Sequence, residues 1–77
     1  MNWQDHIVVD PKILVGKPVV KGTRIAVELV LDLLAQGWTG EQILENYPGL
    51  TAESLRACVA YASEVVHSER VYPLKTA

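Results

Sequence analysis

The chain changes its hydrophobic pattern once, close to residue 26. Residues 7–25 contain three short β-branched runs, "IVV", "ILV" and "VV", separated by the turn segments "DP", "GKP" and "KG". Short runs of this kind between turn residues predict short strands rather than a helix. A sheet of such strands has unpaired edges, so we expect it to lie on helices or to pair with a second copy.

Helical periodicity begins at Val27. The first expected helix runs from Val27 to about Gln36, and Gly37 is expected to end it. Its polar positions, Glu28, Asp32 and Gln36, form a stripe only about 80° wide. The remaining apolar positions cover more directions than one thin domain can bury, which favours contact with a second copy.

The second expected helix has a complete set of start signals. Thr39 is placed to cap it, Gln42 completes a capping box, and Trp38 and Ile43 occupy the hydrophobic-staple positions. The helix is short, because Pro48-Gly49 closes it.

The third expected helix begins at Thr51 and runs to Ser68 or Glu69, after which Pro73 predicts a non-helical tail. Apolar residues recur along it at helical spacing and predict one core stripe, formed by Leu55, Cys58, Val59, Ala62, Val65 and Val66.

The last two helices, joined by "YPGLT", form a helix-turn-helix pattern. One interpretation is a structural three-helix scaffold. The other is a DNA reader in which the start of the third helix presents Thr51, Glu53, Ser54, Arg56 and Ala57 or Ala60. Only Arg56 offers a strong base contact, and the acids Glu41, Glu45 and Glu53 would repel phosphate.

Length and composition limit the possibilities further. The 77 residues predict a single domain, 1–77, with a strand arm (7–25), a three-helix bundle (26–69) and a tail (70–77). The net charge of −2 argues against a surface that grips nucleic acid everywhere. One cysteine allows no internal disulfide, so extra burial is expected from a homodimer. We expect no membrane span and no signal peptide, and therefore a cytoplasmic protein.

No catalytic or metal-binding pattern is visible. Cys58 and His67 lie about 180° apart on one expected helix, and Cys58 is interpreted as a core residue. His6 and His67 lack further ligands at metal spacing. We therefore expect a protein that is not an enzyme and has no cofactor, no metal and no small-molecule substrate.

The charged turn around Gly22 allows two interpretations. In the structural one, Gly22 adopts a positive φ, Thr23 bonds the turn, and Arg24 pairs with an acid such as Glu28. In the functional one, Lys17, Lys21 and Arg24 form a basic rim for phosphate or for the acidic groups of a partner. If DNA is bound, the expected contacts are Lys17, Lys21, Arg24 and Arg56.

The order of "GKP", "GTRI", the leucine-rich helix, "ILENYPGLT" and "AYA" resembles the bacterial family catalogued as domain of unknown function 433. The resemblance covers about residues 7 to 66. It implies a mainly α fold with short N-terminal β-strands, in which a β-hairpin arm precedes a homeodomain-like helix-turn-helix bundle. It also implies a role as an antitoxin beside a PIN-like ribonuclease toxin.

Two functional hypotheses follow. The first is an antitoxin that neutralises a PIN-like nuclease and also binds operator DNA; the second is a free-standing DNA-binding regulator. The tail offers Tyr72 and Leu74 as anchors for a partner, with Arg70 and Lys75 directed toward its acidic groups. The alternative for the tail is an ordinary frayed terminus.

Overall fold

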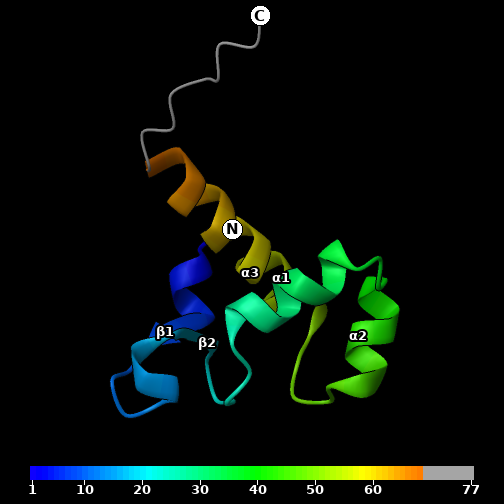
Figure 1. The fold of residues 1–77 in the computed structure, drawn as a ribbon, viewed down its shortest axis with the longest axis horizontal. Helices are drawn as coiled ribbons and strands as arrows, with labels where there is room; N and C mark the ends of the chain where they lie inside the picture. The colour runs from blue at the N-terminus through cyan, green and yellow to red at the C-terminus, as the bar shows by residue number, and fades with distance from the viewer. Residues whose placement is uncertain (69–77) are drawn as a thin grey trace, which may run out of the picture.

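The computed structural model describes residues 1–68 of the chain. It contains a two-stranded hairpin followed by three α-helices, so the mainly α fold with an N-terminal hairpin is confirmed (Figure 1). The strands and α-helices, in chain order, are β1 (Ile7–Val9), β2 (Pro18–Val20), α1 (Val27–Ala35), α2 (Gly40–Asn46) and α3 (Ala52–Ser68). Two 3-10 turns, η1 (Trp3–Asp5) and η2 (Leu14–Gly16), precede the two strands.

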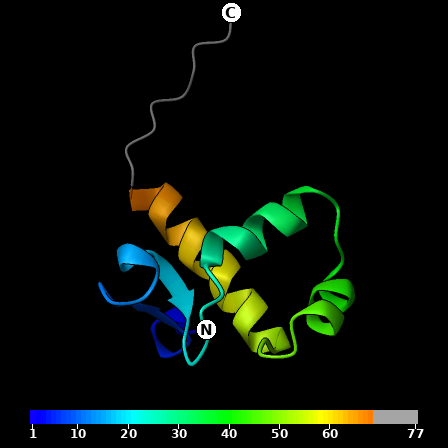
Figure 2. The same ribbon diagram turned by 60° about the horizontal axis from the view of Figure 1, so that its bottom comes forward.

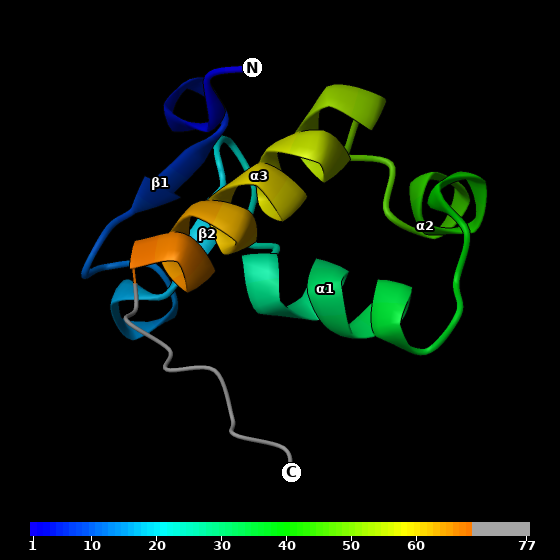
Figure 3. The ribbon, with the colours of Figure 1, turned by 90° about the horizontal axis from the view of Figure 1, so that it is seen from above.

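The hairpin is held against the helices by its buried side chains. β1 and β2 pair antiparallel with Ile7 opposite Val20, and a further bridge joins Val19 to Ala26. Ile7, Val19 and Val20 are buried. Figure 3 shows β1 on one side of α3 and α1 on the other. A hairpin this short is marginal in water, so its packing on the helices is what stabilises it.

The expected strand at "ILV" is wrong. Leu14 and Val15 instead form η2 within the connection between the strands, where Leu14, Val15 and Gly16 all have positive φ. The N–H of Gly16 donates to the carbonyl of Ile13 at 3.1 Å, which closes the turn. The chain must reverse direction between two paired strands, and this requirement overrides the β preference of the run.

α1 begins and ends where the sequence predicts. The N–H of Gly37 donates to the carbonyl of Leu34, and that of Trp38 to the carbonyl of Leu33, both at 3.0 Å, while Gly37 has φ +96°. This is the Schellman pattern that a glycine after the last turn allows. The helix buries more of its apolar surface than expected: Val27, Val30 and Leu33 are buried, and Leu29, Leu31 and Leu34 are half-buried against the core.

α2 starts with the expected cap, and α3 starts one residue after Thr51, which caps it. Thr39 and Gln42 form the reciprocal capping box of α2, with hydrogen bonds of 2.8 and 3.1 Å. At the start of α3, the N–H of Ser54 donates to Thr51 Oγ1 at 3.1 Å. Ile43 is completely buried and Trp38 packs against the core, as the staple predicts.

The predicted core stripe of α3 is confirmed at Cys58, which is buried, and at Leu55, which packs partly buried against the core, but it is wrong at the valines. α3 lies between the hairpin and the pair α1 and α2 (Figure 2). The residues that it buries there are Ser54, Ala57 and Cys58, whereas Val59, Val65 and Val66 are 49%, 37% and 61% exposed. A central helix with neighbours on several sides needs small side chains at its contacts, so the bulkier valines lie outside them.

A contact that the sequence did not indicate lies at the N-terminus. In η1, the indole of Trp3 donates a hydrogen bond to Glu64 and stacks edge-on against Tyr61, with ring centroids 4.9 Å apart. Trp3 and Tyr61 are both partly buried against the core. The contact ties the first residues to the far half of α3.

Candidate interaction surfaces

The charged turn around Gly22 has a structural role. Gly22 has φ +81°, the hydroxyl of Thr23 donates to the carbonyl of Val20 at 2.8 Å, and the N–H of Ile25 donates to Thr23 Oγ1 at 2.9 Å. The methyl of Thr23 also lies against Gly49, where an added Cβ would come within 3.4 Å. The structural interpretation of Gly22 and Thr23 is confirmed. It does not exclude a function for the charged residues beside them.

The expected ion pair between Arg24 and Glu28 is wrong. Glu28 instead accepts a hydrogen bond from Lys17, whose Nζ lies 2.6 Å from Glu28 Oε1. This hydrogen bond and the negative charge of Glu28 raise the pKa of Lys17 above its ordinary value. Lys17 and Glu28 line one shallow hollow together with Ala26, so the folded chain brings Lys17 to the start of α1.

The structure divides the four candidate DNA contacts among three places. Lys17 lies directly before β2. Lys21 and Arg24 are exposed on the turn between β2 and α1. This turn lies near the N-terminus of α3, because the N–H of Lys21 donates to the carbonyl of His6, and the His6 imidazole lies 4.0 Å from the Glu53 carboxylate.

Arg56 is exposed on α3 and lines an apolar groove. The groove has a volume of about 580 Å³ and is lined by Met1, Leu34, Gly40, Leu55, Arg56, Val59, Ala60 and Ser63. It follows the outward side of α3 and is bordered by the end of α1 and the start of α2. In the helix-turn-helix interpretation, this side of α3 would face DNA.

Two residues expected to read bases are buried. Ser54 is 6% exposed and Ala57 is completely buried, so neither reaches the surface. The expectation that they are presented to DNA is therefore wrong. The helix is rotated so that its small residues meet the core, and that rotation turns Arg56, Val59 and Ala60 outward.

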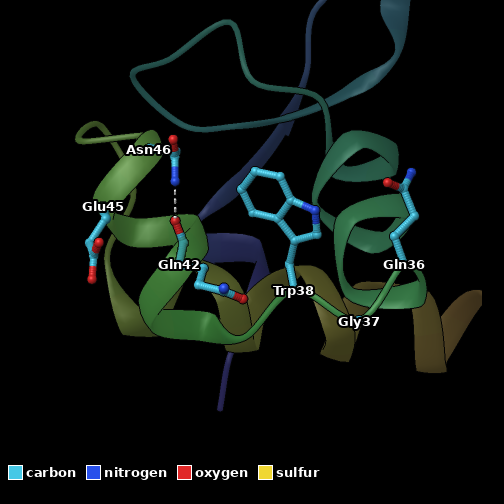
Figure 4. A pocket seen from close by; sticks show the side chains of 6 residues that line it. All are labelled: Gln36, Gly37, Trp38, Gln42, Glu45 and Asn46. Atoms are coloured by element: carbon cyan, nitrogen blue, oxygen red, sulfur yellow. Dashed lines mark hydrogen bonds between the residues drawn. The ribbon is translucent and has the colours of Figure 1, made fainter.

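A second pocket lies where α1 turns into α2 (Figure 4). It has a volume of about 390 Å³ and contains the indole of Trp38 beside Gln42 and Asn46. The amide of Asn46 donates to the carbonyl of Gln42 at 2.8 Å, and Gln42 caps its own helix. In residues 1–68, every buried side-chain nitrogen or oxygen has a hydrogen-bond partner. Gln42 and Asn46 therefore serve the two ends of α2.

The hairpin connection exposes two apolar residues in a strained conformation. Leu14 and Val15 have φ of 47° and 56°, and Val15 is 95% exposed. A positive φ costs a β-branched residue about 1–2 kcal/mol. The β-branched pattern predicted a strand here and gave no indication of an exposed turn. The signal that was available is the group of turn residues Gly16, Lys17 and Pro18 directly after the run.

Cys58 and His67 lie in different surroundings on α3. Cys58 is completely buried, as predicted, and burial raises the pKa of its thiol from 9.0 to about 11. Nδ1 of His67 lies 2.7 Å from the carbonyl of Ser63 on its own helix. Among residues 1–68, no three His, Cys, Asp or Glu side chains form a metal site. Over the same residues, no helix is both long and apolar enough to span a membrane.

The predicted partner contacts of the tail, Arg70, Tyr72, Leu74 and Lys75, lie outside the described residues. They stay a prediction from the sequence.

The fold and these surfaces define a class of protein: a small, mainly helical domain with a two-stranded hairpin arm. Residues 7–62 match the family described as "Protein of unknown function (DUF433)", which is more than half of the chain. The chain belongs to this family, and the resemblance seen in its motifs is confirmed.

Two similar proteins are consistent with this assignment. The "Uncharacterized protein y4eO" of Sinorhizobium fredii (strain NBRC 101917 / NGR234) is 46% identical over 52 residues. That match covers 68% of this chain but only 24% of the relative, so the chain spans about a quarter of its length. The crystal structure of a DUF433 member protein from Anabaena variabilis superimposes with a TM-score of 0.77 and 34% identity. It covers 84% of this chain and 64% of that protein.

Proposed function

We propose that this protein is an antitoxin-like interaction protein that binds and neutralises a PIN-like ribonuclease toxin. DNA binding is a secondary activity through which it regulates its own operon. The observation that carries the proposal is the apolar outward side of α3, where Leu55, Val59 and Ala60 line a groove. An exposed apolar surface of this kind is typical of a contact with another protein.

Charge supports a protein partner over DNA. A helix that reads DNA needs cations toward the phosphates and polar groups toward the bases. On the outward side of α3, Arg56 is accompanied by the apolar side chains of Leu55 and Val59. Glu53 is exposed in the first turn of the same helix. An apolar surface with an acid at one end suits a protein better than a phosphate backbone.

The exposed cations supply a means of inhibition. A PIN-like nuclease needs clustered carboxylates to hold its metal ions, and a cation placed among them would displace the metal. Within residues 1–68, Lys21 and Arg24 are exposed on one turn, whereas Lys17 is already paired with Glu28. The turn with Lys21 and Arg24 is therefore the first candidate for the contact with the carboxylates of the toxin. The tail cations Arg70 and Lys75, which lie outside the described residues, are the second candidate.

The test is co-expression of this chain with the protein encoded by the neighbouring gene, followed by measurement of complex formation and nuclease inhibition. We expect Val59→Glu to abolish the complex, and Lys21→Glu with Arg24→Glu to reduce inhibition. Lys12→Glu is the matched control, because Lys12 is exposed on the connection between β1 and β2. Deletion of residues 70–77 separates the tail from the turn. A neighbour that is not a nuclease, or that neither binds nor is inhibited, would contradict the proposal.

A free-standing DNA-binding regulator is the second candidate. The turn that carries Lys21 and Arg24 lies near the N-terminus of α3, and Arg56 is exposed on α3 itself. This grouping of cations favours the DNA-binding candidate. Titration of upstream DNA at several salt concentrations tests it. We expect weak binding with a shallow salt dependence, in which each lost phosphate contact lowers the slope by about 0.9. Tight, sequence-specific binding by the protein alone would favour this candidate over the antitoxin.

A further inference from the structure

The outward side of α3 carries an apolar seam with the spacing of a coiled coil. Ala52, Leu55, Val59, Ala62 and Val66 follow one another at intervals of three and four residues. At 100° per residue they lie within an arc of about 80°, and the buried residues Ser54, Ala57 and Cys58 lie on the neighbouring arc. Val59 is 49% exposed and Val66 is 61% exposed. Leu55 also packs partly buried against the core, so the seam shares this residue with the core contact and is free at Val59 and Val66.

We propose that this seam pairs in parallel with the same seam of a second copy of this chain. A repeat of three and four residues fits another helix, because it keeps one narrow stripe facing the partner along the whole contact. Val59 and Val66 occupy two of the three a positions and Leu55 one of the two d positions, while Ala52 and Ala62 occupy the others. Valine at a with leucine at d favours two parallel strands. The chain itself supplies the matching helix, so a two-fold axis along α3 completes the contact.

Charges at the borders of the seam favour the same arrangement. Arg56 lies about 100° from Leu55 on one side of the seam. α2 begins beside Leu55, because a Cβ added at Gly40 would lie 3.5 Å from Leu55 Cδ1, and the exposed Glu41 follows Gly40. In a parallel pair, each border meets the opposite border of the partner. Arg56 of each copy then faces the Glu41 side of the other, twice by symmetry.

This contact differs from the pairing that the sequence predicted through the strand arm and the first helix. Leu29, Leu31 and Leu34 of α1 are half-buried within one chain, so less of α1 is free for a partner than its sequence indicated. The seam on α3 is short compared with ordinary interfaces of about 800 Å² per partner. We expect a dissociation constant in the micromolar range.

The pairing does not rest on the proposed binding of a toxin. A partner protein in the same groove would compete with the second copy, so self-association is measured on the chain alone and toxin binding on the co-expressed pair. Failure of one measurement leaves the other intact.

Sedimentation of the full chain across the micromolar range tests the pairing. We expect a shift from monomer to dimer, and we expect Val59→Glu or Val66→Glu to hold the chain as a folded monomer. Val15→Glu is the matched control, because Val15 is 95% exposed and lies on the hairpin connection. A wild-type monomer throughout the range would overturn the proposal, as would a dimer that survives Val59→Glu and Val66→Glu.

A charge exchange and a cross-link test the orientation. Arg56→Glu is expected to weaken the dimer about tenfold, and Glu41→Arg in the same chain is expected to restore it. Val66→Cys should form a disulfide with its own copy under mild oxidation, since an a residue faces its equivalent only in a parallel pair. Val15→Cys should not form such a disulfide. A dimer without the Val66→Cys cross-link and without charge rescue would overturn the parallel arrangement.

Discussion

α1 and α3 both carry apolar stripes, but the structure uses them in opposite ways. The leucine-rich stripe of α1 enters the core through Val27, Val30 and Leu33. The valines of α3 lie outside, while its small residues face inward. α3 lies between the hairpin and the other helices, so several neighbours limit the volume at its contacts (Figure 2). Apolar character alone therefore does not identify the buried side of a helix; the space left by its neighbours decides.

The largest effect should come from the core stripe of α1. Leu33→Ala removes a buried side chain and leaves a cavity, so we expect a loss of about 3 kcal/mol in the free energy of unfolding. Urea denaturation measures it. If Leu33→Ala lowered the unfolding free energy less than the exposed substitution Val59→Ser on α3, the α1 stripe would not be the core.

The pH dependence of stability should show how closely α3 is packed at Cys58. The folded chain holds the thiol pKa at about 11, above the ordinary 9.0, so only the unfolded chain loses this proton between those values. Its contribution to stability is full below pH 9 and falls as the pH rises toward 11, by about 2–3 kcal/mol. Urea denaturation of the chain and of Cys58→Ala across this range measures the difference. If the unfolding free energy changed with pH in the same way in both proteins, the thiol of Cys58 would not be buried.

The need for small residues on α3 can be tested by adding volume. Ala57 is completely buried, so Ala57→Leu should destabilise the fold by about 1–3 kcal/mol through overpacking. Val59→Leu also adds volume, but on the outward side of the helix, and serves as the control. Thermal denaturation of both variants checks this, and equal melting temperatures would argue against close packing at Ala57.

The smallest effect should come from the outward valines of α3. Val59→Ser removes apolar surface that is already half-exposed, so we expect a change within about 0.5 kcal/mol in the unfolding free energy of the monomer. The measurement belongs at low protein concentration, where self-association does not contribute. A loss as large as that of Leu33→Ala would place Val59 in the core after all.

Much of the local structure could be predicted because its causes are local. The capping box of Thr39 and Gln42, the glycine end of α1 at Gly37 and the cap at Thr51 each depend on residues a few positions apart. The turn at Gly22 and Thr23 is of the same kind. These signals predicted where the helices begin and end.

The surfaces could be predicted only in part. The sequence identified Lys21, Arg24 and Arg56 as candidate contacts, and all three are exposed, but it paired Arg24 with Glu28, which Lys17 binds instead. The DNA-reading interpretation expected Ser54, and Ala57 or Ala60, at the surface, but Ser54 and Ala57 are buried and only Ala60 lines the outward groove. The partner of a side chain and the rotation of a helix depend on segments distant in the chain, which local spacing does not contain.

The sequence by itself determined the order of the hairpin and the helices, their ends and the burial of Cys58. Propensity, capping and apolar periodicity act over a few residues, so they can be read along the chain. Only the tertiary structure decided that Leu14 and Val15 form a strained connection, that Lys17 pairs with Glu28, and that α3 turns its valines outward. Each of these depends on which segments meet in space, and close packing admits only side chains that fit the volume left there.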